Sequence, residues 1–220
     1  MLAFLLVLAT SLFWLWLIAR HDDHEREPWP LLLLAGALGA LAAGGVLWAR
    51  PMLENWLAPL SPLLEVFVVT ALAEEAWKLL AFLPLLCLRE LDEPLDGAVY
   101  GVTVGLGFAT VENLHFASAH ADFVALLQRT STASLVHLAA SGCAGLCLAE
   151  AKLRRFGLGT FGWILLGIGV AVGAHGCYDL FLGGDRAQAL LSLLVVLPVM
   201  AGLLAMKVHW ARSRSRDFHP

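Results

Sequence analysis

The stretch Ala73-Glu74-Glu75-Ala76-Trp77-Lys78 places three charged side chains inside an apolar run from Leu63 to Leu88. That run is long enough to cross a bilayer as a helix. A charged side chain at the bilayer centre costs about 2.5–3.5 kcal/mol on insertion scales, and such residues usually face the bundle interior and serve a function. Glu74 and Lys78 lie four residues apart and could neutralise each other on one helix face, but Glu75 would remain unpaired. The stretch therefore predicts a functional site at membrane depth.

The composition of the whole chain is typical of a polytopic helical membrane protein. Of its 220 residues, 60% are hydrophobic and 15% are charged, and the mean hydropathy is +0.78. Soluble domains are less apolar than this. The net charge of −4 is small and says nothing about nucleic acid, and no nucleic-acid partner is expected. The lipid bilayer is therefore the expected environment of the chain.

Seven apolar segments can be drawn, each near the roughly 20 residues that a membrane-spanning helix requires. They are Leu2–Ala19, Leu31–Ala49, Leu63–Leu88, Asp96–Ala117, Ala133–Ala149, Thr160–Leu182 and Ala187–Met206. We predict an all-α polytopic membrane protein, a bundle of about seven transmembrane helices that forms one domain over residues 1–220. The core motif region is expected at 63–182, and a flexible basic tail at 208–220.

Two details refine these segments. The first segment lacks a basic n-region, and Phe13-Trp14-Leu15-Trp16 lies where a signal peptide would have its small-residue cleavage site. We therefore expect this segment to remain as an anchored helix. Pro84 lies within the third segment and is expected to kink its inner end, because proline removes a helical hydrogen bond.

The basic residues of the connecting segments predict the orientation. One side of the bundle carries ten of the 14 lysines and arginines: Arg20, Arg26, Arg89, Lys152, Arg154, Arg155, Lys207, Arg212, Arg214 and Arg216. The opposite side carries Arg50, Arg129 and Arg186, and Lys78 lies within the membrane. By the positive-inside rule, the N-terminus lies outside and the C-terminus is cytoplasmic. We expect a multi-pass integral protein of the cytoplasmic membrane.

The polar residues of four segments converge on one layer, the predicted outer half of the membrane. With alternating helix directions, this layer contains Glu112, Asn113, His137, His175 and Asp179, while Glu74 and Glu75 lie deeper, near the midplane. The site is therefore expected among the third to sixth helices of the bundle.

The face on which Glu112 lies supports this convergence. Glu112 follows Gly105 by seven residues and Gly101 by eleven, so it shares a helix side with these small residues. Small residues at four-residue spacing mark the closely packed face of a membrane helix. The Glu112 carboxylate is therefore expected to point into the bundle.

The histidines differ in their expected roles. His175 and Asp179 lie four residues apart and share a face, as a metal ligand and the carboxylate that orients it often do. His115 is also expected to point inward, as a spare ligand. His120 and His209 are expected in a loop or at an interface.

Two histidines with carboxylates form the donor set that a catalytic zinc uses, with three protein ligands and one open position for water. A further glutamate that does not bind the metal can accept the proton of that water. A membrane-embedded site of this kind suits peptide hydrolysis.

The order of these motifs resembles the PrsW family of intramembrane proteases. The motifs are Glu74-Glu75-Ala-Trp-Lys78, Gly107-Phe108-Ala-Thr-Val-Glu112-Asn113, His137 and His175-Gly-Cys-Tyr-Asp179. They extend over about half of the chain. The PrsW family is similar in turn to the CAAX-processing and bacteriocin-processing proteases, with their EExxxR, FxxxH and HxxxN motifs. Lys78 stands here in place of an arginine one position later, and Glu112 in place of a histidine; both are similar to the PrsW branch.

The resemblance implies an intramembrane endopeptidase. Its substrate would be a membrane-anchored protein, such as an anti-sigma factor or another single-span protein, cleaved from the outer side. Glu74 resembles the water-activating glutamate, and Glu75 its neighbour in the same catalytic motif. The implied ligands of a divalent metal, with zinc the expected one, are Glu112, His137 and His175. The side chains that would hold these in orientation are Lys78, Asn113 and Asp179.

Two other functions are compatible with charges inside a membrane. A proton- or ion-coupled transporter also uses Glu, His and Lys relays, but it predicts polar residues in both halves of the membrane and inverted repeats. The inner halves of these segments are almost bare, and no such repeat is visible. A non-catalytic membrane assembly protein could keep the scaffold, but its polar constellation would be expected to be broken, whereas this one is complete.

The distribution of basic residues, ten against three, makes the orientation testable. A reporter fused after Arg216 should read cytoplasmic, and a reporter inserted near Ala121 should read external. If both reporters read cytoplasmic, the number of spans is wrong by one, and the site does not lie in the outer half.

Overall fold

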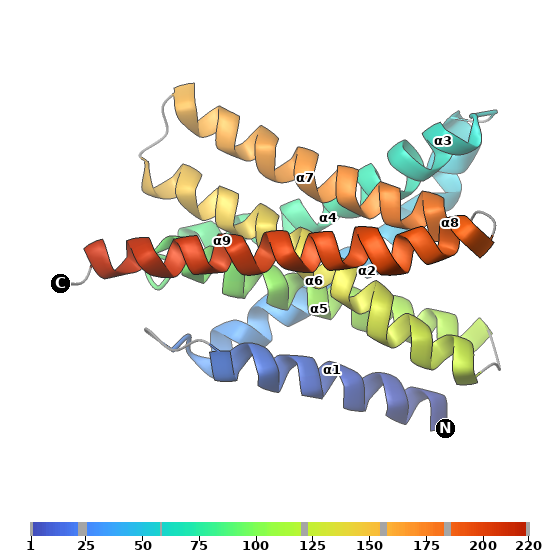
Figure 1. Ribbon diagram of the computed structural model, residues 1–220, viewed down its shortest axis with the longest axis horizontal. Helices are drawn as coiled ribbons and strands as arrows, with labels where there is room; N and C mark the ends of the chain where they lie inside the picture. Colours follow the sequence, from blue (N-terminus) through green and yellow to red (C-terminus); the bar gives the residue numbers. More distant parts are fainter. Residues whose placement is uncertain are drawn as a thin grey trace.

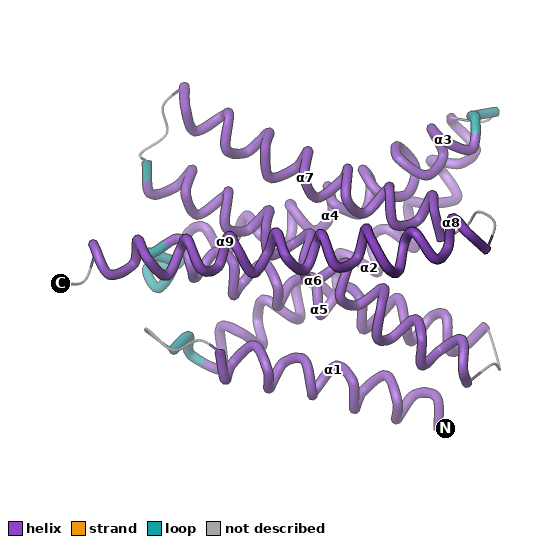
Figure 2. Tube along the Cα trace, viewed as in Figure 1, coloured by secondary structure: helices purple, strands orange, loops and turns teal. Residues whose placement is uncertain are grey.

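The computed structural model describes residues 2–21, 26–57, 59–119, 123–154, 158–182 and 186–218, in which every regular element is a helix (Figure 2). The α-helices are α1 (Leu2–His21), α2 (Trp29–Leu57), α3 (Pro62–Leu64), α4 (Ala73–Phe82), α5 (Pro94–Ala119), α6 (Phe123–Leu153), α7 (Leu158–Leu182), α8 (Arg186–Leu191) and α9 (Leu197–Phe218). The π-helices are η1 (Glu65–Leu72) and η3 (Ser192–Val196), and η2 (Leu83–Cys87) is a 3₁₀-helix. The prediction of an all-α fold is confirmed.

The elements form a bundle that the chain crosses back and forth, so that its two termini lie at opposite ends (Figure 1). The elements from α3 to η2 follow one another without interruption, as do those from α8 to α9. Among the described residues, five helices are long and apolar enough to cross a membrane: Leu2–Arg20, Trp29–Leu57, Phe123–Leu153, Gly159–Leu182 and Ala187–Trp210. The other two predicted spans, at 63–88 and 96–117, correspond to the α3–η2 segment and to α5, which carry Glu74, Glu75, Lys78 and Glu112.

The α3–η2 segment is the least regular part of the bundle. The Ser61 side chain caps its start by accepting a hydrogen bond from the backbone N–H of Leu64 at 3.4 Å, and Pro62 occupies the first turn, where its missing N–H has no helical partner. The π-helix η1 follows and ends directly before α4. Such turns are rare and frequently accompany functional sites. The α-helix ends at Phe82 and η2 begins at Leu83, directly before Pro84, the residue expected to kink this end.

Helix α5 packs against α6 almost backbone to backbone. A Cβ atom added to Gly105 would lie 2.5 Å from the carbonyl oxygen of His137, and one added to Gly101 would overlap the carbonyl of Ser141. The prediction that the glycine face of α5 is closely packed is therefore confirmed. On the side of α2, a Cβ atom on Gly107 would overlap the backbone carbonyl of Gly36.

A second polar cluster lies around the start of α5, at the other end of the bundle. The Tyr100 hydroxyl donates to the Glu27 carboxylate, and Asp96 accepts two backbone N–H bonds, at 3.0 and 2.7 Å, from the segment before α5. The Lys152 ammonium donates to two carbonyls of the segment between η2 and α5, both at 2.7 Å. Of these polar side chains, only Asp96 and Tyr100 lie within a predicted span, and Glu27 and Lys152 lie in the segments that connect the spans.

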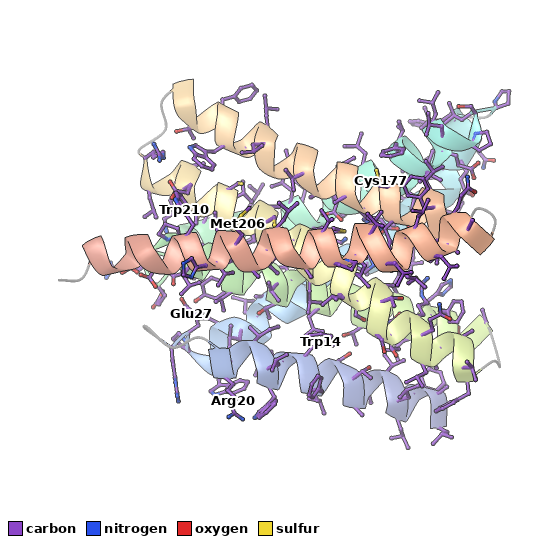
Figure 3. The ribbon with its side chains drawn as sticks, in the orientation of Figure 1. Trp14, Arg20, Glu27, Cys177, Met206 and Trp210 are labelled. Atoms are coloured by element: carbon purple, nitrogen blue, oxygen red, sulfur yellow. The ribbon has the colours of Figure 1, made fainter. Side chains whose placement is uncertain are left out.

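Helix α9 continues through Phe218, so residues 208–218 of the expected tail are helical. Trp210, labelled on this helix in Figure 3, stacks with Trp163 of α7, and the ring centroids are 6.3 Å apart. Residues 219 and 220 lie outside the described part of the chain.

The close approach of α5 to α2 can be tested at Gly107. The Gly107→Ala variant should lose about 1–3 kcal/mol of unfolding free energy, because the new methyl group must push two backbones apart. Gly44→Ala on α2 is the matched control, since nothing lies within 4 Å of its added Cβ atom. Thermal unfolding in detergent compares the two variants, and equal stabilities would contradict the packing described above.

Candidate active site

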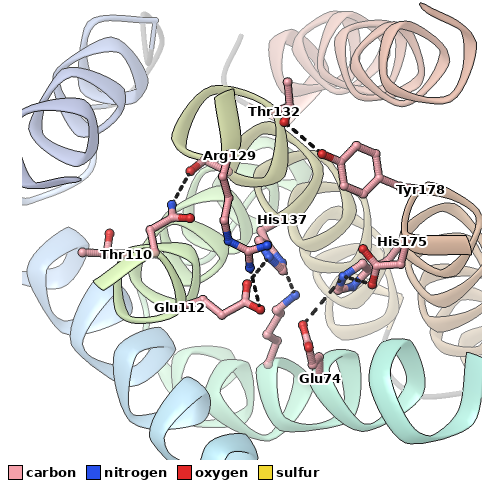
Figure 4. Close-up of polar contacts among 12 residues, drawn as sticks. Glu74, Thr110, Glu112, Arg129, Thr132, His137, His175 and Tyr178 are labelled. Carbon is pink, nitrogen blue, oxygen red and sulfur yellow. Dashed lines mark hydrogen bonds and ion pairs between the residues drawn. The ribbon is translucent and has the colours of Figure 1, made fainter. Parts of the chain in front are cut away.

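The predicted polar residues meet in the interior of the bundle (Figure 4). They come from four helices: Glu74, Glu75 and Lys78 from α4, Glu112 from α5, His137 from α6, and His175 and Asp179 from α7. The α4 residues and both histidines are no more than 5% exposed. Charged groups this deeply buried must be paired or bind a ligand.

The Lys78 ammonium bridges two helices. Its Nζ lies 2.7 Å from Oε1 of Glu75 and 2.7 Å from Nδ1 of His137, and it lies over the Phe108 ring at 4.3 Å. The sequence favoured Glu74 as its partner, and this was wrong. Both glutamates are one turn away, but the contacts with α5 and α6 hold the ammonium on the side of Glu75.

His175 lies among three carboxylates. Its Nδ1 is 2.9 Å from Oε1 of Glu75, and its Nε2 is 3.3 Å from Oδ2 of Asp179 and 3.7 Å from Oε2 of Glu74. The expected contact between His175 and Asp179 is therefore present. Glu75 consequently connects the Lys78 ammonium to the His175 ring.

Glu112 is paired with a residue that the sequence analysis did not assign to the site. Its Oε1 lies 3.0 Å from the Arg129 guanidinium, and its Oε2 lies 2.8 Å from Nε2 of His137. Arg129 was counted as a loop charge because the apolar segment begins only at Ala133, whereas α6 begins at Phe123. The available signal was spacing: Arg129 lies eight residues before His137, which places both on a similar side of a helix.

The other predicted residues lie outside this cluster of contacts. Asn113 donates to the Ser134 hydroxyl at 3.0 Å and so ties α5 to α6 without touching either site histidine. His115 is exposed, so its expected inward direction was wrong. His120 lies outside the described residues, and His209 lies on α9.

A polar cavity of about 210 Å³ adjoins the cluster. Its lining includes Glu74, Glu112, Arg129, His137, His175, Tyr178 and Asp179. Glu75 does not line it, although it is adjacent to Glu74 in the chain. The Tyr178 hydroxyl donates to Thr132 at 2.9 Å at the wall of the cavity (Figure 4). The cavity therefore gives water access to Glu74 and the histidines, with Glu75 held behind them.

Three of these side chains could hold a metal ion. Glu74, His137 and His175 each offer a ligand atom, and these atoms lie within 4.8 Å of one another. Oε2 of Glu74 is buried without a hydrogen-bond partner among the described residues, which fits an acceptor that awaits a ligand. Both ring nitrogens of His137 have partners, so a metal bound to this ring would replace one of them. The group contains Glu74 where the sequence analysis expected Glu112.

Comparisons with known proteins give a consistent result. Residues 27–203 match the model of the PrsW family of intramembrane metalloproteases. The chain is similar to proteins named Protease PrsW from Geobacillus kaustophilus (30% identity over 66% of this chain and 71% of the relative), Clostridioides difficile (26%, over 90% and 86%) and Shouchella clausii (31%, over 82% and 85%). No solved structure matches the chain.

The Lys78 bridge can be tested by stability. Lys78→Ala leaves Glu75 charged and unpaired in the interior, so the unfolding free energy should fall by about 3–5 kcal/mol. Adding Glu75→Gln to that variant should recover much of the loss, because the unpaired charge at position 75 is then removed. Arg50→Ala is the control, since its pair with Glu54 is over 40% exposed and should contribute less than about 1 kcal/mol. A fully stable Lys78→Ala protein would show that the ammonium stabilises nothing.

Proposed function

The chain belongs to the PrsW family of intramembrane metalloproteases, and from this we propose that it hydrolyses a peptide bond of a membrane-anchored protein in the cavity beside Glu74. The observation that carries this proposal is that Glu74 lines the polar cavity together with His137 and His175, while its Oε2 has no hydrogen-bond partner among the described residues. An acceptor in that position can take the proton of an attacking water.

Glu74 differs from the two other glutamates of the cluster. Glu75 is bound to Lys78 and His175, and Glu112 is bound to Arg129 and His137. Both carboxylates are therefore held by cationic or N–H groups and serve to position the histidines. Glu74 is left to accept a proton, in agreement with the resemblance on which its role was first assigned.

The metal would be held by His137, His175 and one carboxylate oxygen of Glu74, and zinc suits this donor set. The second oxygen of Glu74 would then be the one that accepts the proton of the water. When bound, such a metal lowers the pKa of a coordinated water and polarises the peptide carbonyl. The protein's own side chains orient His175 and shape the cavity. Glu75 orients His175 through Nδ1, Asp179 lies against Nε2 of the same ring, and the packed helices around the cavity limit access of bulk water.

The position of the cavity indicates how a substrate would approach. Glu112, Arg129 and Asp179 lie near the ends of α5, α6 and α7 at one end of the bundle, which the basic residues predict to be the outer end. A single-span protein with its cleavage site in or near the outer half of the membrane would reach this cavity. An anti-sigma-factor-like protein is such a substrate.

The Glu74→Gln variant tests this function. The amide keeps the shape of the side chain but cannot accept the proton, so turnover should fall by at least about 10²-fold. The protein should still fold, because a neutral amide is less costly in a membrane than a carboxylate. Turnover is measured as release of the outer domain of a co-expressed single-span substrate.

Two further variants complete this experiment. Glu65→Gln is the control, because Glu65 is exposed on the neighbouring η1. Metal content of the purified proteins should fall most in His175→Ala and less in Glu74→Gln, whose amide oxygen can still coordinate. Native turnover in Glu74→Gln would refute the assigned role, and unchanged metal content in His175→Ala would refute the assigned ligand.

A further inference from the structure

A small second cavity lies between α4, α5, α6 and α7, on the inner side of the Lys78 bridge. Its polar lining consists of Glu75, Lys78 and Ser141, and the rest is apolar side chain or glycine. It offers about 20 Å³ of space for the centre of a water-sized molecule, and roughly 10–15 Å³ is enough for one water. None of these three polar residues lines the larger cavity at Glu74.

Ser141 carries a buried hydroxyl without a hydrogen-bond partner among the described residues. Other hydroxyls in these helices donate to the carbonyl four residues earlier, as Thr103 does at 2.8 Å and Thr110 at 2.7 Å. The same option is open to Ser141 at the carbonyl of His137, and the side chain does not use it. A buried hydroxyl that does not donate to its local carbonyl lowers the stability of the fold unless another hydrogen-bond partner lies nearby.

Lys78 supplies the second unsatisfied group. An ammonium carries three N–H donors, and the contacts with Glu75 and His137 use two of them. One donor therefore remains without a hydrogen-bond acceptor, and the Phe108 ring at 4.3 Å and the small cavity both lie beside it. A buried water needs two to four polar partners, and the cavity wall provides Ser141, Lys78 and the Glu75 carboxylate.

We propose that this cavity binds one ordered water molecule, which accepts a hydrogen bond from Lys78 and links it to Ser141 and Glu75. A metal cation does not fit, because an ammonium forms part of the wall. An anion does not fit either, because Glu75 lies beside it. A neutral molecule that both donates and accepts, and whose centre fits within about 20 Å³, is water.

The water makes Ser141 a positioning residue. Ser141 touches neither His175 nor Glu74 in any described contact, but it acts through the Lys78 ammonium. That ammonium holds His137 directly and His175 by way of Glu75. The water site itself does not depend on the proposed hydrolysis or on which residues bind a metal, because it follows from the cavity and its polar wall.

High-resolution structures of the full chain in lipid nanodiscs test the water directly. The wild-type map should contain an ordered water within hydrogen-bond distance of Ser141 Oγ and Lys78 Nζ, and Ser141→Ala should lose it. Ser131→Ala on the same helix is the control and should keep it, because the exposed Ser131 hydroxyl donates to its own helix at 2.9 Å. A map that resolves other buried waters but none here would overturn the proposal, as would a Ser141 hydroxyl bound to the carbonyl of His137.

Kinetics test the positioning role. In Ser141→Ala, kcat should fall by roughly 3- to 10-fold, the loss expected from one water-mediated hydrogen bond, while KM stays unchanged because Ser141 does not line the larger cavity. Ser131→Ala should keep the native kcat. A native kcat in a Ser141→Ala protein that has lost the water would refute the positioning role. If neither the wild-type protein nor any variant shows turnover, the proposed function fails. The density maps still show whether the water is present.

Discussion

The active-site cluster depends on the buried contact between the Lys78 ammonium and the Glu75 carboxylate. Two charges at 2.7 Å in a nearly water-free interior are stable only when their remaining donors and acceptors are also satisfied. Here the ammonium also reaches His137 on α6, and the carboxylate also reaches His175 on α7. One ion pair thus connects three helices and fixes the position of both histidine rings. Its desolvation cost is offset by these extra contacts.

The short side chains of the cluster can meet only because the helices approach closely. The Gly101 and Gly105 backbone lies against the carbonyls of Ser141 and His137, so α5 and α6 run in near backbone contact at the level of the site. Glu112, two turns further along the same side of α5, can then reach Nε2 of His137 at 2.8 Å. A larger residue at either glycine would push the two helices apart and lengthen this contact. Small residues and buried charges are therefore two parts of one arrangement.

Much of this site could be predicted from the sequence, because charged side chains on apolar helices usually face the interior of the bundle. The convergence of four helices, the glycine face of α5 and the pairing of His175 with Asp179 all follow from helical periodicity. The partner of Lys78 could not be predicted, since residues three and four positions away are equally within reach and contacts from other helices decide between them. The π-helix η1 has no comparable sequence signal. Arg129 was missed because α6 extends well beyond its apolar segment.

The adjacency of Glu74 and Glu75 explains how one motif supplies two different carboxylates. Consecutive residues on a helix point about 100° apart, so the two side chains of α4 enter different surroundings. Glu75 points towards Lys78 and His175, and its charge is neutralised there; Glu112 is neutralised in the same way by Arg129. Glu74 faces the polar cavity, where Nε2 of His175 at 3.7 Å is beyond hydrogen-bond distance of its free oxygen. The cluster thus neutralises two of its glutamates with dedicated cations and leaves the third without one. An acceptor for a proton or a metal must remain unsatisfied until its ligand arrives, and the helix geometry of this motif produces that condition at Glu74 alone among the three glutamates.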